Sequence, residues 1–143
     1  FVEFNSDLVT DEAAFAAETQ RVRRAIETAI RSGRTAAAYT CRRELVIPGD
    51  TPESALLRSV KISDAVQSLV GGLDVRPAFV LAKGGITSSD VGTKALGVKR
   101  ATVLGRNPAR GCGKAAVTKN RQAFFGLPVA AFQGGLRSWP LRA

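Results

Sequence analysis

The residues best suited to chemistry lie in one glycine-rich stretch, Lys83-Gly84-Gly85-Ile86-Thr87-Ser88-Ser89-Asp90. Two adjacent glycines let backbone N–H groups approach a ligand with no Cβ in the way. The side chains of Thr87, Ser88 and Ser89 add hydroxyl donors, and Lys83 adds a positive charge. Donors of this kind, gathered at a turn before a helix, suit a phosphate group.

A purely structural interpretation of the same residues stays open. Ser88 or Ser89 would cap the following helix, Asp90 would complement the helix dipole in its first turn, and the glycines would only form a tight turn. The stretch has neither the G-x-x-x-x-G-K-[ST] spacing of a Walker A loop nor the G-x-G-x-x-G spacing of a dinucleotide site. Phosphate binding and helix capping therefore both remain possible at this point.

The elements that would position this turn alternate along the chain. We expect an edge strand over residues 1–4, helices over 11–32 and from Thr51 to Gly71-Gly72, and strands over 35–40, 78–81 and 101–104. A short helix over 92–96 follows the glycine turn. This order predicts an α/β fold, a three-layer-like sandwich with a largely parallel or mixed sheet flanked by helices. Ligands bind at the carboxyl ends of such strands, where the Gly84-Gly85 turn lies.

The first two helices each show an apolar face and end signals. Gly33 occupies a C-cap position, and Thr51 and Pro52 fit the N-cap and N1 positions of the second helix. The apolar residues expected to face a core are Phe15, Val22, Ile26, Ala29 and Ile30 in the first helix, and Leu56, Leu57, Val60, Val66, Leu69 and Val70 in the second.

Composition limits the possible functions. A chain of 143 residues suits one domain, 1–143. It contains no His, which removes the usual general base and metal ligand, and its two cysteines, Cys41 and Cys112, are expected to be free thiols. We find neither an apolar run long enough to cross a membrane nor a signal peptide, so we expect a cytoplasmic protein. The lack of Met and the start at Phe1 suggest a fragment.

The net charge of +9 is unevenly distributed. Residues 1–90 hold 11 Lys or Arg and 12 Asp or Glu, whereas residues 91–143 hold 10 Lys or Arg and no acid. A basic segment of this kind could contact nucleic acid through phosphates. Nucleic acid is not favoured, however, because the chain shows no RRM, KH, zinc-finger or helix-turn-helix pattern and is only 6% aromatic.

The segment Lys83-Gly84-Gly85-Ile86-Thr87-Ser88-Ser89-Asp90-Val91, continuing through Thr93-Lys94-Ala95-Leu96-Gly97-Val98 to Val103-Leu104-Gly105, resembles the signature of the four-carbon acid sugar kinases. More narrowly, it resembles their C-terminal nucleotide-binding domain. Weaker similarity reaches back through Tyr39-Thr40-Cys41-Arg42 and the helix over 11–32. The resemblance covers roughly the first three quarters of the chain.

The resemblance implies ATP-dependent phosphoryl transfer to a hydroxyl group of a four-carbon sugar acid, with ATP and Mg²⁺ as cofactors. It implies ATP-binding roles for Gly84, Gly85, Thr87, Ser88 and Gly134, no catalytic residue in this chain, and no identified metal ligand. In the family, the acidic catalytic motif and the sugar-acid site belong to an N-terminal domain that these residues do not include. The isolated chain is therefore predicted to be inactive. The alternatives are a basic nucleic-acid-binding module and a structural remnant without activity.

The segment after Gly105 departs from the family pattern. Residues 125–132 resemble the family's last strand, and Gly134 matches the glycine of a loop near the nucleotide, but Gly135 stands where an asparagine is expected. Two explanations stay open for residues 106–143: divergence, or translation of part of the segment out of frame. We favour the second, since a long acid-free stretch rich in Arg, Gly, Ala and Pro is typical of GC-rich codons read in the wrong frame.

Overall fold

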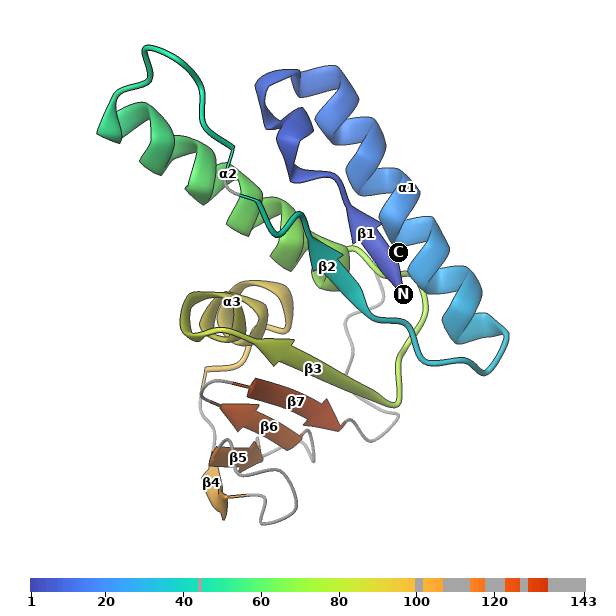
Figure 1. Ribbon diagram of the computed structural model, residues 1–143. Coiled ribbons are helices and arrows are strands. Elements are labelled where there is room, and N and C mark those ends of the chain that lie inside the picture. Colours follow the sequence, from blue (N-terminus) through green and yellow to red (C-terminus); the bar gives the residue numbers. More distant parts are fainter. Residues whose placement is uncertain (44, 100–101, 107–113, 118–122, 127–128, 134–143) are drawn as a thin grey trace. The chain divides into compact units, whose positions relative to one another are not determined.

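Up to residue 106, helices and strands follow one another in the order that the sequence predicts, and further strands follow without an intervening helix in the described part of the chain (Figure 1). The computed structural model describes residues 1–143 except 44, 100–101, 107–113, 118–122, 127–128 and 134–143. The chain divides into two units, Phe1–Val75 and Arg76–Ala143. The fold is mixed α/β, which confirms the predicted class.

The first unit combines two long helices with a small parallel sheet. Its elements are β1 (Val2–Phe4), the 3-10 helix η1 (Ser6–Thr10), α1 (Glu12–Arg31), β2 (Ala38–Thr40) and α2 (Pro52–Gly71). The strands β1 and β2 pair in parallel, with Val2 opposite Ala38 and Phe4 opposite Thr40. The predicted strand over 35–40 is therefore shorter than expected.

The ends of both helices follow from their local sequence. Asp11 caps α1 by accepting a hydrogen bond from the Ala14 N–H at 3.0 Å. At the other end Gly33, at φ +72°, donates to the Ile30 carbonyl, and Arg34 donates to the Ala29 carbonyl. This pair of bonds is a Schellman motif, which needs a left-handed residue that glycine supplies best.

The second helix begins as predicted. Its N-cap is Thr51, whose Oγ1 accepts from the Ser54 N–H at 3.2 Å, and Pro52 stands at the first helical position. Proline is tolerated there because the N–H it lacks would have had no partner inside the helix. Gly72 is the C-cap, as the Gly71-Gly72 pair indicates.

The core of the first unit forms around Phe4, Val22 and Leu69, with Phe15 and Ile26 packed against it. The predicted inner face of α1 is thus confirmed at these positions. The prediction for α2 is only partly right: Leu69 is buried, but Leu56, Leu57 and Val60 are 65%, 68% and 48% exposed. The core packs against the C-terminal half of the helix, and apolar residues nearer its start extend beyond it.

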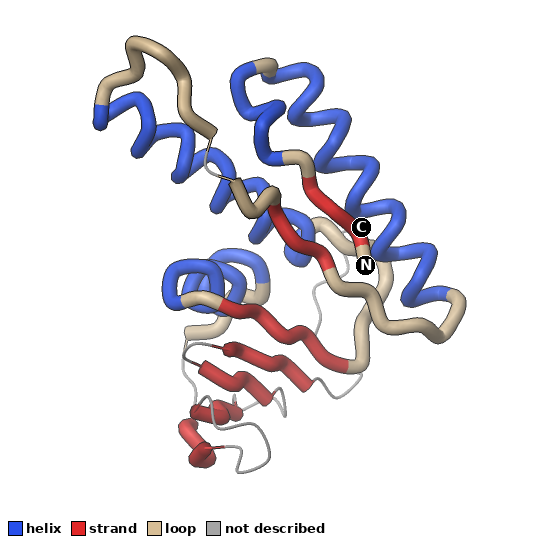
Figure 2. Tube along the Cα trace, in the orientation of Figure 1, coloured by secondary structure: helices blue, strands red, loops and turns tan. Residues whose placement is uncertain are grey.

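The second unit is built on one sheet of five strands, which Figure 2 shows beside the third helix. The strands are β3 (Phe79–Lys83), β4 (Thr102–Arg106), β5 (Lys114–Val117), β6 (Ala123–Gly126) and β7 (Val129–Gln133), in the spatial order β3-β7-β6-β5-β4. Between β3 and β4 lie α3 (Gly85–Asp90) and the π-helical turn η2 (Val91–Ala95).

All pairings in this sheet are antiparallel, whereas β1 and β2 of the first unit pair in parallel. The expectation of one largely parallel or mixed sheet is therefore not met by the described strands. The reason lies in the connections. A parallel pair needs a crossover of roughly a dozen residues or more. Only residues 107–113, 118–122 and 127–128 separate the successive strands from β4 to β7. Connections this short allow neighbouring strands to pair only in antiparallel fashion.

Candidate functional site

The glycine turn joins the end of β3 directly to the start of α3. Gly84 has φ +109° and ψ 145°, a backbone conformation that is essentially restricted to glycine. A Cβ built on Gly84 would meet only the side chain of Thr87, at 3.6 Å from its Oγ1. The turn therefore needs glycine for its backbone conformation rather than for lack of space.

The helix after the turn begins earlier than predicted. It starts at Gly85, and Gly84 serves as its N-cap without any side-chain hydrogen bond. The first N–H groups of an α-helix have no partner within the helix. Capping by Ser88 or Ser89 is therefore wrong, since both residues lie inside α3. In the described structure no side chain caps the start of α3 in their place.

Ser88 is buried beneath the turn, with 2% of its surface exposed. Its Oγ donates toward the Gly84 carbonyl at 2.6 Å and lies 3.2 Å from the Gly85 carbonyl, and its N–H donates to the Gly84 carbonyl at 2.9 Å. A hydroxyl group has one hydrogen to donate. The Ser88 hydroxyl hydrogen is directed at the Gly84 carbonyl, so this side chain stabilises the turn.

Thr87 differs from Ser88 in its environment. Its side chain is half-buried and stands beside Gly84. Within the described part of the chain, its hydroxyl group makes no hydrogen bond. This hydroxyl is thus an available side-chain donor at the turn, and Lys83, with an exposed side chain, is the adjacent cation.

Asp90 was expected in the first turn of a helix, but it is the last residue of α3. Its carboxylate accepts from the Lys94 Nζ at 3.1 Å, one turn along the continuing helix. Across the described ranges, no three His, Cys, Asp or Glu side chains lie close enough to hold a metal ion. Mg²⁺ is more often bound through one or two carboxylates and substrate phosphates than by a complete protein cage.

Gly134, the remaining predicted site residue, lies outside the described residues. The preceding strand, β7, runs antiparallel to β3, with Val129 opposite Lys83 and Gln133 opposite Phe79. The structure therefore brings Gly84, Gly85, Thr87 and Ser88 together in one turn. The contribution of Gly134 stays a prediction.

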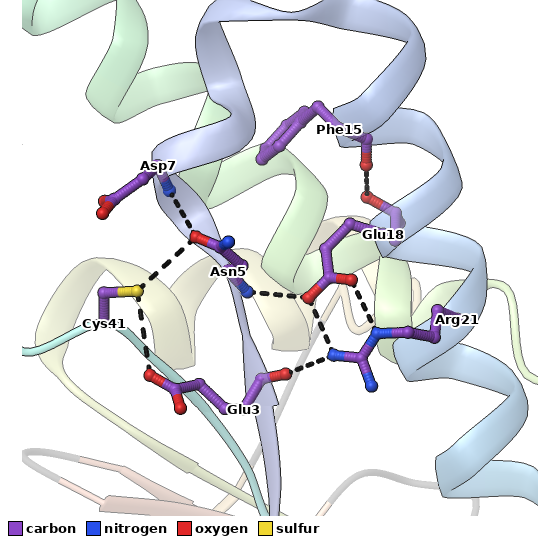
Figure 3. A network of polar contacts seen from close by, with 8 residues as sticks. Glu3, Asn5, Asp7, Phe15, Glu18, Arg21 and Cys41 are labelled. Atoms are coloured by element: carbon purple, nitrogen blue, oxygen red, sulfur yellow. Dashed lines mark hydrogen bonds and ion pairs between the residues drawn. The ribbon is translucent and has the colours of Figure 1, made fainter.

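A second polar cluster, which the sequence analysis did not identify, lies in the first unit (Figure 3). The buried Glu18 accepts a hydrogen bond from the Asn5 N–H at 2.8 Å and two from the Arg21 guanidinium, at 2.6 and 2.8 Å. Arg21 also donates to the Glu3 carbonyl at 2.7 Å. The Arg21 hydrogen bond is the main reason that the pKa of Glu18 is lowered, and burial opposes it.

This cluster fixes the chain where β1 ends. The Asn5 Oδ1 accepts from the Asp7 N–H at 3.2 Å, and the Cys41 Sγ lies 3.8 Å from both the Asn5 Oδ1 and the Glu3 Oε1 (Figure 3). Cys41 is a free thiol, as predicted, while Cys112 lies outside the described residues. Ligand sites form where parallel strands end, and Asn5 and Cys41 directly follow the predicted strands at residues 1–4 and 35–40. This rule, applied to the sequence, could have pointed to the cluster.

A similar ion pair holds the loop before α2. The Arg58 guanidinium contacts the Asp50 carboxylate, and this hydrogen bond is the main cause of the lowered pKa of Asp50. Both residues are close to the cap of α2, so the pair has a structural role.

No helix in the described part of the chain has the length and apolar character that a membrane crossing needs.

Comparison with known protein families gives a match over most of the chain. The model of a family described as nucleotide-binding C-terminal domain matches residues 2–136. No curated protein and no solved structure matches the chain. The matched range begins at β1 and includes the glycine turn between β3 and α3.

Proposed function

Since the chain belongs to the nucleotide-binding C-terminal domains of the four-carbon acid sugar kinase family, we propose that it binds ATP for phosphoryl transfer to a hydroxyl group of a tetronate-type sugar acid. The observation that carries the proposal is the turn from β3 into α3, where Gly84 adopts a conformation reserved for glycine. This turn lies in the residues that resemble the family signature.

In the proposed complex, the backbone at Gly84 and Gly85 and the hydroxyl groups of Thr87 and Ser88 face the phosphates of ATP, with Gly134 as a further contact. The backbone N–H groups at the start of α3 have no side-chain cap, which supports this assignment. Thr87 supplies the available hydroxyl donor, while Ser88 must release its bond to Gly84 before it can donate to a phosphate.

Mg²⁺ would arrive with the nucleotide in this proposal. The phosphates and water would supply most of its ligands, which suits a chain whose described residues contain no metal-binding cluster. Its contribution is to neutralise the charge on the transferred phosphoryl group. No residue of this chain is assigned to chemistry, because the catalytic acid is expected in another domain of the kinase.

We further propose that residues 1–143 form one nucleotide-binding domain that acts in the cytoplasm as the C-terminal part of a larger kinase. The support for one domain is that a single family model extends over both structural units. The sugar acid would bind through the N-terminal domain of the kinase.

The test is the substitution Gly85→Val. A branched side chain at this position would stand where the phosphate must approach, so the dissociation constant for ATP should rise at least about tenfold, which corresponds to about 1.4 kcal/mol. Isothermal titration calorimetry of the chain with Mg·ATP measures this dissociation constant. Gly71→Val, at the end of α2, is the matched control and should leave ATP affinity unchanged. Equal ATP affinity of the wild type and a folded Gly85→Val variant would rule out the assignment.

A further inference from the structure

The solvent side of α2 carries apolar residues that no core covers. Leu56, Leu57 and Val60 are exposed, and because residues three or four positions apart share a face of a helix, they lie together on one side of α2. The core of the first unit packs against the other side, through Val66 and Leu69. A helix that is apolar on both sides is typical of one that is buried on both sides. The exposed face therefore has the character of an interface.

The charges on this face are arranged symmetrically about Leu57. Glu53 lies four residues before Leu57 and Lys61 four residues after it, so acid, leucine and base follow one another along a single ridge of the helix. Both charged side chains are exposed, and within the described part of the chain neither makes a hydrogen bond or an ion pair. Eight residues separate them, about 12 Å along the helix axis, so they cannot pair with each other in one chain.

A second copy of the same helix supplies a partner for each charge. When two α2 helices pack antiparallel about a two-fold axis at Leu57, residues at equal distances before and after Leu57 lie at the same level. Glu53 of each copy then lies beside Lys61 of the other, and the two Leu57 side chains meet at the axis. Parallel packing would place Glu53 beside Glu53 and Lys61 beside Lys61, which is unfavourable. The charges thus favour one orientation of the two copies.

The overall charge of the chain favours the same unit as the place of contact. Residues 1–75, the first unit, hold 9 Lys or Arg and 11 Asp or Glu, a net charge of −2, whereas the whole chain has +9. Two copies that met through their basic C-terminal residues would repel each other. Two copies that meet through α2 bring nearly neutral units together.

We propose that two copies of this chain form a symmetric dimer through antiparallel α2 helices. Leu56, Leu57 and Val60 form the centre of the interface, and two Glu53–Lys61 ion pairs lie at its edges. Burial of the apolar side chains supplies most of the free energy, since exposed ion pairs contribute little, and the charges set the register. One helix face from each copy gives a small interface, below about 1,200 Å² in total, so the dimer should dissociate on dilution.

The dissociation constant of the dimer is measured by sedimentation equilibrium of the full chain over a wide range of concentrations. The wild type should pass from the monomer to a species of twice the mass as the concentration rises. Leu57→Gln removes the central apolar contact at little cost in helix propensity and should raise the dissociation constant at least about tenfold. Leu81→Gln, at a similarly exposed leucine of β3 in the second unit, is the matched control and should leave it unchanged.

Charge reversal tests the antiparallel register. Glu53→Lys and Lys61→Glu should each raise the dissociation constant at least about tenfold, because each brings like charges together at both edges of the interface. The double variant Glu53→Lys/Lys61→Glu exchanges the two charges and should return to within about threefold of the wild type. Arg24→Glu, on the exposed surface of α1, is the control for a single reversal and should leave the dissociation constant unchanged. Circular dichroism checks that each variant is folded.

A wild-type chain that stays monomeric at every concentration would overturn the proposal and would point to a different occupant of this face. A dimer that tolerates Leu57→Gln, or that Leu81→Gln weakens equally, would place the contact elsewhere. A double variant that associates no better than the single reversals would rule out the antiparallel pairing. The result does not depend on the nucleotide assignment, because every residue of the interface lies in the first unit and none belongs to the glycine turn.

Discussion

At the scale of single residues, the two adjacent hydroxyl side chains of the glycine turn are expected to play different roles. The Ser88 hydroxyl hydrogen is engaged by the Gly84 carbonyl, and the Thr87 hydroxyl is available. We therefore predict that Thr87→Val, which keeps the side-chain shape and removes the hydroxyl, raises the dissociation constant for ATP about tenfold. Thr93→Val is the control, because the Thr93 hydroxyl already donates to the Ser89 carbonyl and is not offered to a ligand. Unchanged ATP affinity in Thr87→Val would remove Thr87 from the site.

Glu18 provides a prediction for stability rather than binding. Its lowered pKa means that the ionised form is stabilised in the folded chain, mainly by Arg21. A group of this kind contributes stability that is complete above the unfolded pKa, about 4.3 for glutamate, and is lost as the pH falls through the folded value. Glu18→Gln should therefore lower the unfolding free energy by about 1 kcal/mol at pH 7, a modest loss because Arg21 is half exposed.

The measurement for Glu18 is urea unfolding followed by circular dichroism between pH 7 and pH 3. The difference between the wild type and Glu18→Gln should shrink as the pH falls below about 4.3. Glu53→Gln, in the exposed first turn of α2, is the matched control for the loss of one carboxylate. A difference that stays constant over this range would show that the ion pair does not contribute through its charge.

At the scale of elements, Gly84 sets the angle at which β3 passes into α3. Its φ of +109° with ψ of 145° is costly for any residue with a Cβ, by about 1–3 kcal/mol. We predict that Gly84→Ala lowers the stability of the second unit by this amount and weakens ATP binding. Gly97→Ala is the control, because Gly97 also has a positive φ, +62°, with open space around it. It should lose stability, by about 1–2 kcal/mol, without loss of ATP affinity. Equal ATP affinities of the two variants would show that the turn does not hold the nucleotide.

The elements that the sequence predicts best are those determined by local signals. The starts and ends of α1 and α2 follow from Asp11, Gly33, Thr51 and Pro52, whose conformational preferences act within one turn of the helix. The start of α3 was misplaced because a serine is a better cap than a glycine on average, whereas here the required φ of Gly84 decides where the helix begins. The glycine turn itself was predicted at the end of a strand, and the structure has it there.

Predictions that depend on distant parts of the chain were less successful. Helical periodicity aligned Leu56 and Val60 with Leu69, but it cannot show how far the core extends along α2. Strand pairing has the same limitation, because it depends on residues far apart in the sequence. The alternation of helices and strands suggested a parallel sheet, whereas the short connections between the later strands favour antiparallel pairing. The polar cluster around Glu18 was missed because Asn5, Glu18 and Cys41 lie far apart in the sequence and share no spacing pattern.

At the scale of the whole molecule, charge separates the two ends of the chain. Residues 1–90 have a net charge of −1, from 11 basic and 12 acidic side chains, and residues 91–143 have +10, from 10 basic side chains and no acidic one. The family match nevertheless extends to residue 136, across this boundary. The match therefore does not rest on the charge-balanced part alone, because it also includes residues 91–136 of the basic segment.

The isolated chain is predicted to lack kinase activity. Phosphoryl transfer needs the nucleotide, Mg²⁺ and the acceptor hydroxyl in line, together with a residue that orients the acceptor or takes its proton. The chain contains no His, and the catalytic acid is expected in the N-terminal domain of the kinase. We therefore expect no transfer of the γ-phosphate of ATP to threonate or erythronate above the rate without protein, measured by ³¹P NMR of the sugar-acid phosphate. A kinase of the same family that contains both domains is the positive control. Formation of the phosphorylated acid by the wild-type chain, together with its loss in Gly85→Val, would contradict the prediction and place a catalytic group within these residues.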